Sequence, residues 1–185
     1  MRRMSPQLLI ELLETTGKQY SQVIAALDPF AQALYSVAWA GEEQSANRFH
    51  IAREYTEKFH HQQQIREAVG KQGIINAELF YPCVDTFMRG LPHAYRDIEG
   101  DEGSLIQILV TGEAGGSWFS QYNNSNWKLN KTLDKQPDTV VSLSPDTAWK
   151  VFTKAITPQS AIKISDVSGN INLEENLFNL VAVMA

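Results

Sequence analysis

Residues 54–65, EYTEKFHHQQQI, contain a carboxylate at Glu57 and an imidazole at His61, four residues apart. On a helix, such residues lie on one face with Cβ atoms about 6 Å apart, so both side chains can reach one divalent ion. His60 projects about 100° away from this face, and we expect it not to share the ion. A catalytic zinc normally keeps three protein ligands. Residue spacing alone therefore leaves open both a metal site and a solvated polar face.

The helix that carries the pair is expected over residues 46–69, between a cap at Ser45 and a stop at Gly70. An amphipathic helix is expected to precede it, starting at the cap-then-proline pair Ser5-Pro6 and ending at Asp28-Pro29. A third helix is expected over 74–90, with a kink or a short first turn caused by Pro82. The first half of the chain is thus expected to be helical.

The second half changes character near Ile98, where short apolar runs alternate with glycine and asparagine turns. SLIQILVTG and GGSWFSQY are expected to form a hairpin around residues 113–116, and NNSN a second turn before WKLNKTL. TVVSLS is expected to be a further strand. Ser144-Pro145 and Thr157-Pro158 each predict a helix start. LEENLFNLVAVMA predicts a final helix with an apolar stripe made by Leu177, Leu180, Val181 and Met184.

The bulk composition sets limits on the function. With 185 residues and 43% apolar content, the chain suits one large domain or two small ones, and we expect two, 1–97 and 98–185. The net charge of -5 argues against nucleic-acid binding. We also expect no membrane partner, because no run of about 20 apolar residues occurs. One cysteine, Cys83, and no secretory signal indicate a cytoplasmic protein.

The stretch VAWAGEEQSANRFHIAREYTEKFHHQQQIREAVGKQ resembles the metal-binding helix of the mycothiol-dependent maleylpyruvate isomerase family, which belongs to the DinB-like metalloenzymes. In that family a tryptophan-glycine loop and a Ser-Ala cap precede a Glu-x-x-x-His helix. The matching residues here are Trp39, Gly41, Ser45, Ala46, Arg53, Glu57, His61, Gln63, Ile65, Ala68 and Gly70. The resemblance continues through LPHAYRD and into the second half, which resembles that family's sterol-carrier-like C-terminal domain.

The resemblance implies an α+β fold. A three-helix remnant of a DinB-like bundle would precede a sterol-carrier-like α/β domain with a mainly antiparallel sheet. It implies Glu57 and His61 as ligands of a divalent metal, with zinc as the implied ion, and a low-molecular-weight thiol as cofactor. Arg53 and Arg96 are the residues that we associate with cofactor binding. The chemistry implied is that of an isomerase or transferase acting on a small-molecule substrate.

Two departures from the family pattern bear on this interpretation. The family's first ligand histidine lies on a helix before the one that begins here, so we interpret the chain as lacking the first two helices. The family's catalytic arginine near the end of the second domain has no counterpart. Lys163 is the nearest basic residue, but it lacks the bidentate fork of arginine. The alternative function is therefore a non-catalytic binding module that keeps the fold.

Other residues that could do chemistry have simpler explanations. Cys83 fits a buried small hydrophobe better than a nucleophile. His93 fits packing or capping, and Arg89 beside it could neutralise an acidic ligand or hold a helix end. Gly115-Gly116 lacks the strand-turn-helix context of a phosphate loop. An aromatic set could line an apolar pocket or pack the core of the sheet; its members are Trp118, Phe119, Tyr122 and Trp127.

Missing bundle helices would leave apolar side chains uncovered, and each would forfeit about 1.5–3 kcal/mol of burial. We expect this exposed lining to include Leu9, Leu12, Leu13 and Phe59. A second copy of the chain could cover it, and two-fold pairs are the commonest arrangement. The sequence therefore predicts a homo-oligomer, most simply a dimer.

Overall fold

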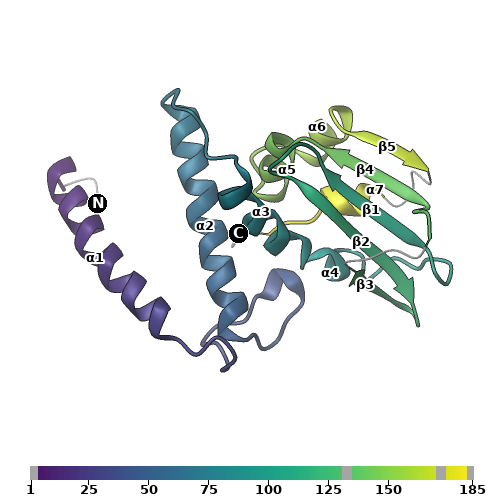
Figure 1. Cartoon of the computed structure of the whole chain (residues 1–185), viewed down its shortest axis with the longest axis horizontal. Coiled ribbons are helices and arrows are strands. Elements are labelled where there is room, and N and C mark those ends of the chain that lie inside the picture. Colours follow the sequence, from purple (N-terminus) through teal and green to yellow (C-terminus); the bar gives the residue numbers. More distant parts are fainter. Residues whose placement is uncertain (1–3, 131–134, 170–173, 183–185) are drawn as a thin grey trace.

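The computed structural model describes residues 4–130, 135–169 and 174–182 and is shown in Figure 1. Helices α1 (Pro6–Ala26), α2 (Asn47–Ala68) and α3 (Ala77–Met88) form the first half, together with the short η1 (Ala38–Ala40) and α4 (Leu91–Ala94). The Ser5 hydroxyl accepts a hydrogen bond from the Leu8 amide, so the predicted cap-then-proline start of α1 is present. The three long helices begin within three residues of the predicted positions.

The second half contains a five-stranded sheet in the order β3-β2-β1-β4-β5. The strands are β1 (Leu105–Val110), β2 (Gly116–Asn123), β3 (Asn126–Asn130), β4 (Thr139–Leu143) and β5 (Asp166–Gly169). β1 and β4 run parallel, and the other three pairs are antiparallel. Asn124 and Ser125 have positive φ angles of 53° and 61°, as a two-residue turn of the type that matches strand twist requires. The mixed helix-and-sheet class and the mainly antiparallel sheet are confirmed.

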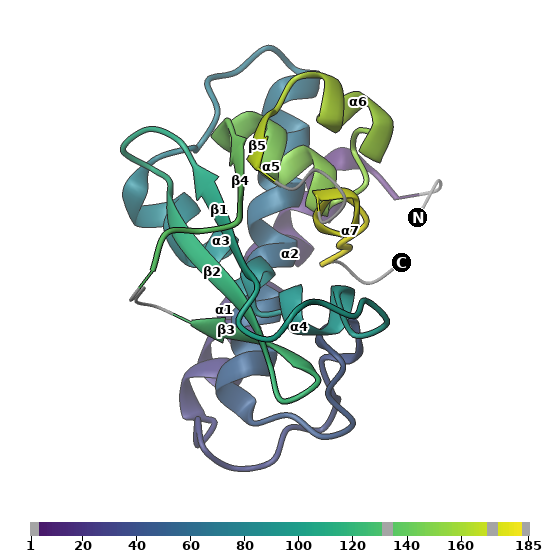
Figure 2. The same ribbon diagram turned by 90° about the vertical axis from the view of Figure 1, so that its right-hand side faces the viewer.

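Three short helices accompany the sheet: α5 (Pro145–Phe152), α6 (Pro158–Lys163) and α7 (Glu174–Phe178). Figures 1 and 2 show α2 and α3 lying together beside the sheet, whereas α1 stands on the far side of α2. Residues on both sides of position 97 join one buried cluster, which includes Phe59, Phe87, Tyr95, Ile106, Trp149 and Phe178. The predicted boundary at 97 stays a prediction, but the core crosses it.

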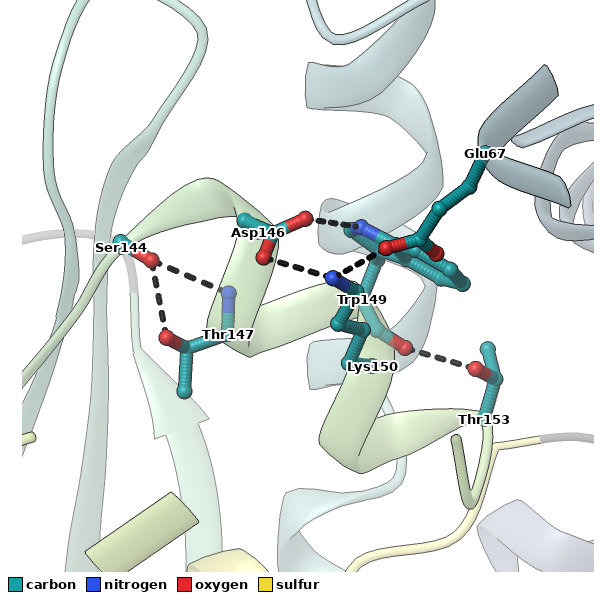
Figure 3. A network of polar contacts seen from close by, with 7 residues as sticks. All are labelled: Glu67, Ser144, Asp146, Thr147, Trp149, Lys150 and Thr153. Carbon is teal, nitrogen blue, oxygen red and sulfur yellow. Dashed lines mark hydrogen bonds and ion pairs between the residues drawn. The ribbon is translucent and has the colours of Figure 1, made fainter. Parts of the chain in front are cut away.

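A polar link fixes α5 against the end of α2, as Figure 3 shows. Lys150 Nζ lies 2.7 Å from Glu67 Oε1 on α2 and 2.9 Å from Asp146 Oδ2 one turn earlier on α5. The hydrogen bond to Glu67 is the largest of the effects that raise the pKa of Lys150. The Trp149 indole N–H donates to the same Asp146. Because this link joins residues 83 positions apart, it ties the helical half to the sheet half.

Several expectations are wrong in detail. The last helix ends at Phe178, so Leu180 and Val181 lie beyond it, and Met184 lies outside the described residues. Strand β5 was not expected. Phe59 is buried against α3 and does not belong to an exposed lining. None of the described helices combines the length and the apolar character needed to cross a bilayer. The cytoplasmic location stays a prediction.

Candidate metal centre

Helix α2 is positioned from both of its sides. The amides of Asn47 and Arg48, in its first turn, donate to the carbonyls of Ala31 and Pro29 in the preceding loop. Further along, the Tyr55 hydroxyl donates to the Leu79 carbonyl of α3, and the Gln63 side chain accepts from the Ile74 amide. Tyr55 and Gln63 therefore hold one face of α2 against α3 and the segment before it.

Glu57 is approached by both histidines of the HH pair. Glu57 Oε2 lies 3.7 Å from His60 Nε2 and 3.6 Å from His61 Nε2. One donor atom from each of the three residues lies within 4.8 Å of the other two. The expectation that His60 points away is therefore wrong. Residues three apart on a helix are also neighbours, and the imidazole of His60 swings back along the helix toward Glu57.

Each histidine has its other ring nitrogen beside an oxygen. His60 Nδ1 lies 3.1 Å from the Thr56 carbonyl, and His61 Nδ1 lies 3.1 Å from Gln64 Oε1. A carbonyl oxygen only accepts, so these contacts place the N–H of the neutral imidazole on Nδ1. The lone pairs at Nε2 then face Glu57. Histidine ligands of metals commonly donate their other nitrogen in this way.

The cluster is closed on one side and open on the other. The side chain of His60 is 5% exposed and that of Glu57 is 18% exposed, whereas His61 is 62% exposed. Burial is the main reason why the pKa of His60 is lowered, with the positive charge of His61 adding to it. The nearby Glu57 carboxylate and the Thr56 carbonyl oppose this shift. A lowered pKa keeps His60 neutral near pH 7, which is the state that binds metals.

The three residues fit a zinc ion. Two ligands at about 2.0–2.2 Å from a tetrahedral ion lie about 3.4 Å apart, close to both measured separations from Glu57. Two imidazoles and one carboxylate form a donor set that zinc accepts, with a fourth position left for a small molecule. The structure thus places His60 beside the two residues that the sequence indicated as ligands. Counting i,i+3 neighbours as well as i,i+4 neighbours would have found it.

The other predicted site residues do not join this cluster. Arg53 is buried one turn earlier, where its Nη2 contacts Glu54 and His50 at 2.8 Å each. Arg96 is exposed, donates to the His93 carbonyl and pairs with Asp97. Lys163 is exposed at the last residue of α6.

The remaining alternatives favour packing roles. Cys83 is fully buried, and desolvation raises the pKa of its thiol, which disfavours the reactive thiolate. His93 packs against Gly41, because a Cβ atom added at that glycine would lie 2.5 Å from His93 Nδ1. Trp118 and Trp127 are buried in the core and donate to Asp85 and to the Ile98 carbonyl. Tyr122 packs against that core as well.

None of the protein-family models matches this sequence, and no curated protein does. Among solved structures, sterol carrier protein 2-like 2 from Aedes aegypti shares 15% identity at a TM-score of 0.41, over 53% of this chain and 95% of that one. Sterol carrier protein domain 2 of Helicoverpa armigera shares 19% identity at a TM-score of 0.40, over 52% of this chain and 84% of that one. Sterol carrier protein 2 from Yarrowia lipolytica shares 14% identity at a TM-score of 0.34, over 74% of this chain and 88% of that one. All three solved structures are sterol carrier proteins or domains of such proteins.

Proposed function

We propose that the chain binds a divalent cation, with zinc the best fit, through Glu57, His60 and His61. The observation that carries this proposal is the convergence of two Nε2 atoms on one carboxylate oxygen, at 3.6 and 3.7 Å. Both histidines are oriented for it by contacts at Nδ1 with the Thr56 carbonyl and Gln64. Burial of His60 further favours the neutral, metal-binding form.

We further propose that a small thiol takes the open coordination position, as the resemblance to mycothiol-dependent maleylpyruvate isomerases implies. A bound zinc ion lowers the pKa of a coordinated thiol and so supplies a thiolate nucleophile at neutral pH. The chain's own contribution is to orient His60 and His61 and to shield one side of the site from water. The exposed side, at His61, gives the thiol and a small-molecule substrate access to the site. Isomerisation or group transfer is the reaction class proposed.

The second candidate function is a binding module without catalysis. It is favoured by the position of Lys163, the basic residue nearest to the family's missing arginine, which is exposed at the end of α6. In this case the metal site would remain, but a charged group to stabilise a reacting substrate would be lacking. The two functions agree on metal binding and differ only in what happens after it.

The metal site is tested with chain purified without a histidine tag, stripped with a chelator and titrated with zinc by calorimetry. We expect one zinc ion per chain. Glu57→Ala, His60→Ala and His61→Ala should each weaken binding by more than the roughly 10–100-fold that loss of a supporting residue costs. Gln64→Ala should fall within that smaller range. His50→Gln, which removes a histidine elsewhere on α2, is the matched control and should bind normally.

The thiol is tested separately with cobalt(II) in place of zinc. Coordination of 2-mercaptoethanol should change the visible absorption of the cobalt-loaded chain and leave that of Glu57→Ala unchanged. Zinc binding without any response to thiols would support the binding module. Substoichiometric zinc that none of the three substitutions alters would overturn the metal site itself.

A further inference from the structure

A cavity of about 480 Å³ lies at the N-terminal end of α2, between the loop before α2 and the end of α3. Arg48 and Arg89 both line it, one from each helix. Its volume is within the range of about 300–1,000 Å³ that small-molecule sites occupy. Arg48 and Glu57 are nine residues apart, so their positions are separated by about 13.5 Å along the helix axis.

The two arginines have few protein acceptors. Among the described residues, the Arg48 guanidinium has no hydrogen bond or ion pair, and it lies 5.6 Å from the centre of the Phe30 ring. Arg89 has one long polar contact, 3.4 Å from Nη2 to Asp85 Oδ2, and Asp85 also accepts from the Trp118 indole. The Arg89 guanidinium also lies 5.9 Å from the centre of the Phe49 ring. Most of the ten N–H groups of two guanidiniums are therefore free to bind a ligand.

The rest of the cavity wall sets the chemistry of that ligand. Phe49 and three alanines, Ala40, Ala46 and Ala52, give it an apolar surface. Glu42 adds one negative charge, and its carboxylate accepts from the Ser45 hydroxyl. The first amides of α2 already donate to Pro29, Ala31 and Ala46, so the N-terminus of this helix does not supply the anion contacts.

We infer that this cavity binds a small organic carboxylate, with its carboxylate at Arg48 and Arg89 and its carbon body against Phe49. Guanidinium groups bind carboxylates through paired, charge-assisted hydrogen bonds. Asp85 offsets part of the charge of Arg89, whereas the Arg48 guanidinium has no carboxylate partner among the described residues and supplies the positive charge for a single carboxylate. An inorganic phosphate carries more negative charge than that and has no apolar part for the alanines and Phe49 to cover.

The test uses benzoate as the probe and benzamide as its neutral match, with binding to the full chain measured by calorimetry. We expect benzoate to bind saturably and benzamide and inorganic phosphate to bind at least tenfold more weakly. Arg48→Gln and Arg89→Gln should each weaken benzoate binding by about tenfold or more, the effect expected for loss of a charged hydrogen-bond partner.

Arg96→Gln is the charge-matched control, because Arg96 is exposed and does not line the cavity. It should bind benzoate like the unchanged chain. Glu57→Gln should do the same, which separates this proposal from the metal site. Circular dichroism of each variant confirms that it is folded. Equal binding of benzoate and benzamide, binding unaffected by either cavity arginine, or no saturable benzoate binding would each overturn the inference.

Discussion

At the scale of single residues, a chain of polar contacts joins α1 to α2. The Tyr20 hydroxyl donates to Glu54 at 3.0 Å, Glu54 accepts from Arg53, and Arg53 also contacts His50 Nδ1. Burial and the hydrogen bond to Glu54 raise the pKa of Tyr20 to about 12. Although burial opposes it, the hydrogen bonds from Arg53 and Tyr20 lower the pKa of Glu54. These polar contacts between α1 and α2 are therefore kept at neutral pH.

His50 makes the same series of polar contacts sensitive to acid. Burial first, and then the positive charge of Arg53, lower the pKa of His50 below 6.5. Arg53 only donates, so His50 Nδ1 must accept and the ring must be neutral. Below pH 6.5 the unfolded chain binds a proton that the folded chain resists, so stability should fall as pH drops through this window.

We predict that the free energy of unfolding, measured by urea titration between pH 7.5 and about pH 5, decreases with acid and decreases less in His50→Gln. His60 has a pKa shifted in the same direction, so the substitution should remove only part of the slope. The measurement is made in the presence of a chelator, so that metal binding does not contribute to the free energy of unfolding. An identical slope in the variant and the unchanged chain would contradict the prediction.

The residues of the candidate site were predictable in part. Glu57 and His61 could be paired from spacing, because four residues make about one helical turn. His60 was missed because a projection of Cα directions ignores the reach of the imidazole, and the rotamer of His60 depends on its burial in the folded chain. Arg48 and Arg89 could not be paired, since only the packing of α2 against α3 brings positions 41 residues apart to one cavity.

At the scale of elements, caps decide where several helices begin. The Ser144 hydroxyl accepts from the Thr147 amide at 3.0 Å, next to Pro145 in the first turn of α5, and Figure 3 shows this contact. Thr157 and Asn76 make equivalent contacts at α6 and α3. Each satisfies an amide that the helix itself leaves without a partner.

We predict that Ser144→Ala lowers the free energy of unfolding by about 1 kcal/mol, whereas Ser144→Asp, which keeps a capping oxygen, loses much less. Urea unfolding of the three chains provides the measurement. The control is Ser168→Ala in β5, which changes an exposed serine that caps no helix. Equal losses for alanine and aspartate at position 144 would show that the cap is not the cause.

The same local rules explain which elements could be foreseen. Ser5-Pro6, Ser144-Pro145 and Thr157-Pro158 are short signals that act within one turn, and all three helices start as expected. Strand β5 was missed because its four residues, DVSG, have one apolar side chain and depend on pairing with β4. The last helix was expected to be longer because its apolar stripe continues past Phe178, but the chain there packs without helical structure.

At the scale of the whole molecule, helix α1 packs only loosely against the rest of the protein. It spans 21 residues, and none of them is buried. Its exposed apolar side chains include Ile10, Leu12, Leu13 and Val23, of which Leu13 is 70% exposed. Glu11, Glu14 and Lys18 project from the opposite face, as the helical period requires. The helix that carries these side chains is about 31 Å long. A two-fold pair would bury the same apolar face of both copies against each other.

We predict that a second copy of the chain covers this stripe. Sedimentation velocity at micromolar concentration should give twice the 20.8 kDa mass of one chain. Leu13→Gln combined with Val23→Gln should shift the mass to that of a monomer, because polar side chains at these positions remove the gain from burial. Glu14→Gln, on the opposite face, should leave the dimer intact. A monomeric profile for the unchanged chain would refute the prediction.

The seclusion of Cys83 has a practical consequence for all of these experiments. Because the thiol of Cys83 is buried and resists ionisation, oxidising and alkylating reagents should not react with it. A cysteine introduced on the outer surface of α1 would then be the sole site for a spectroscopic label. Such a probe could follow how that helix moves when a cation or a second copy arrives.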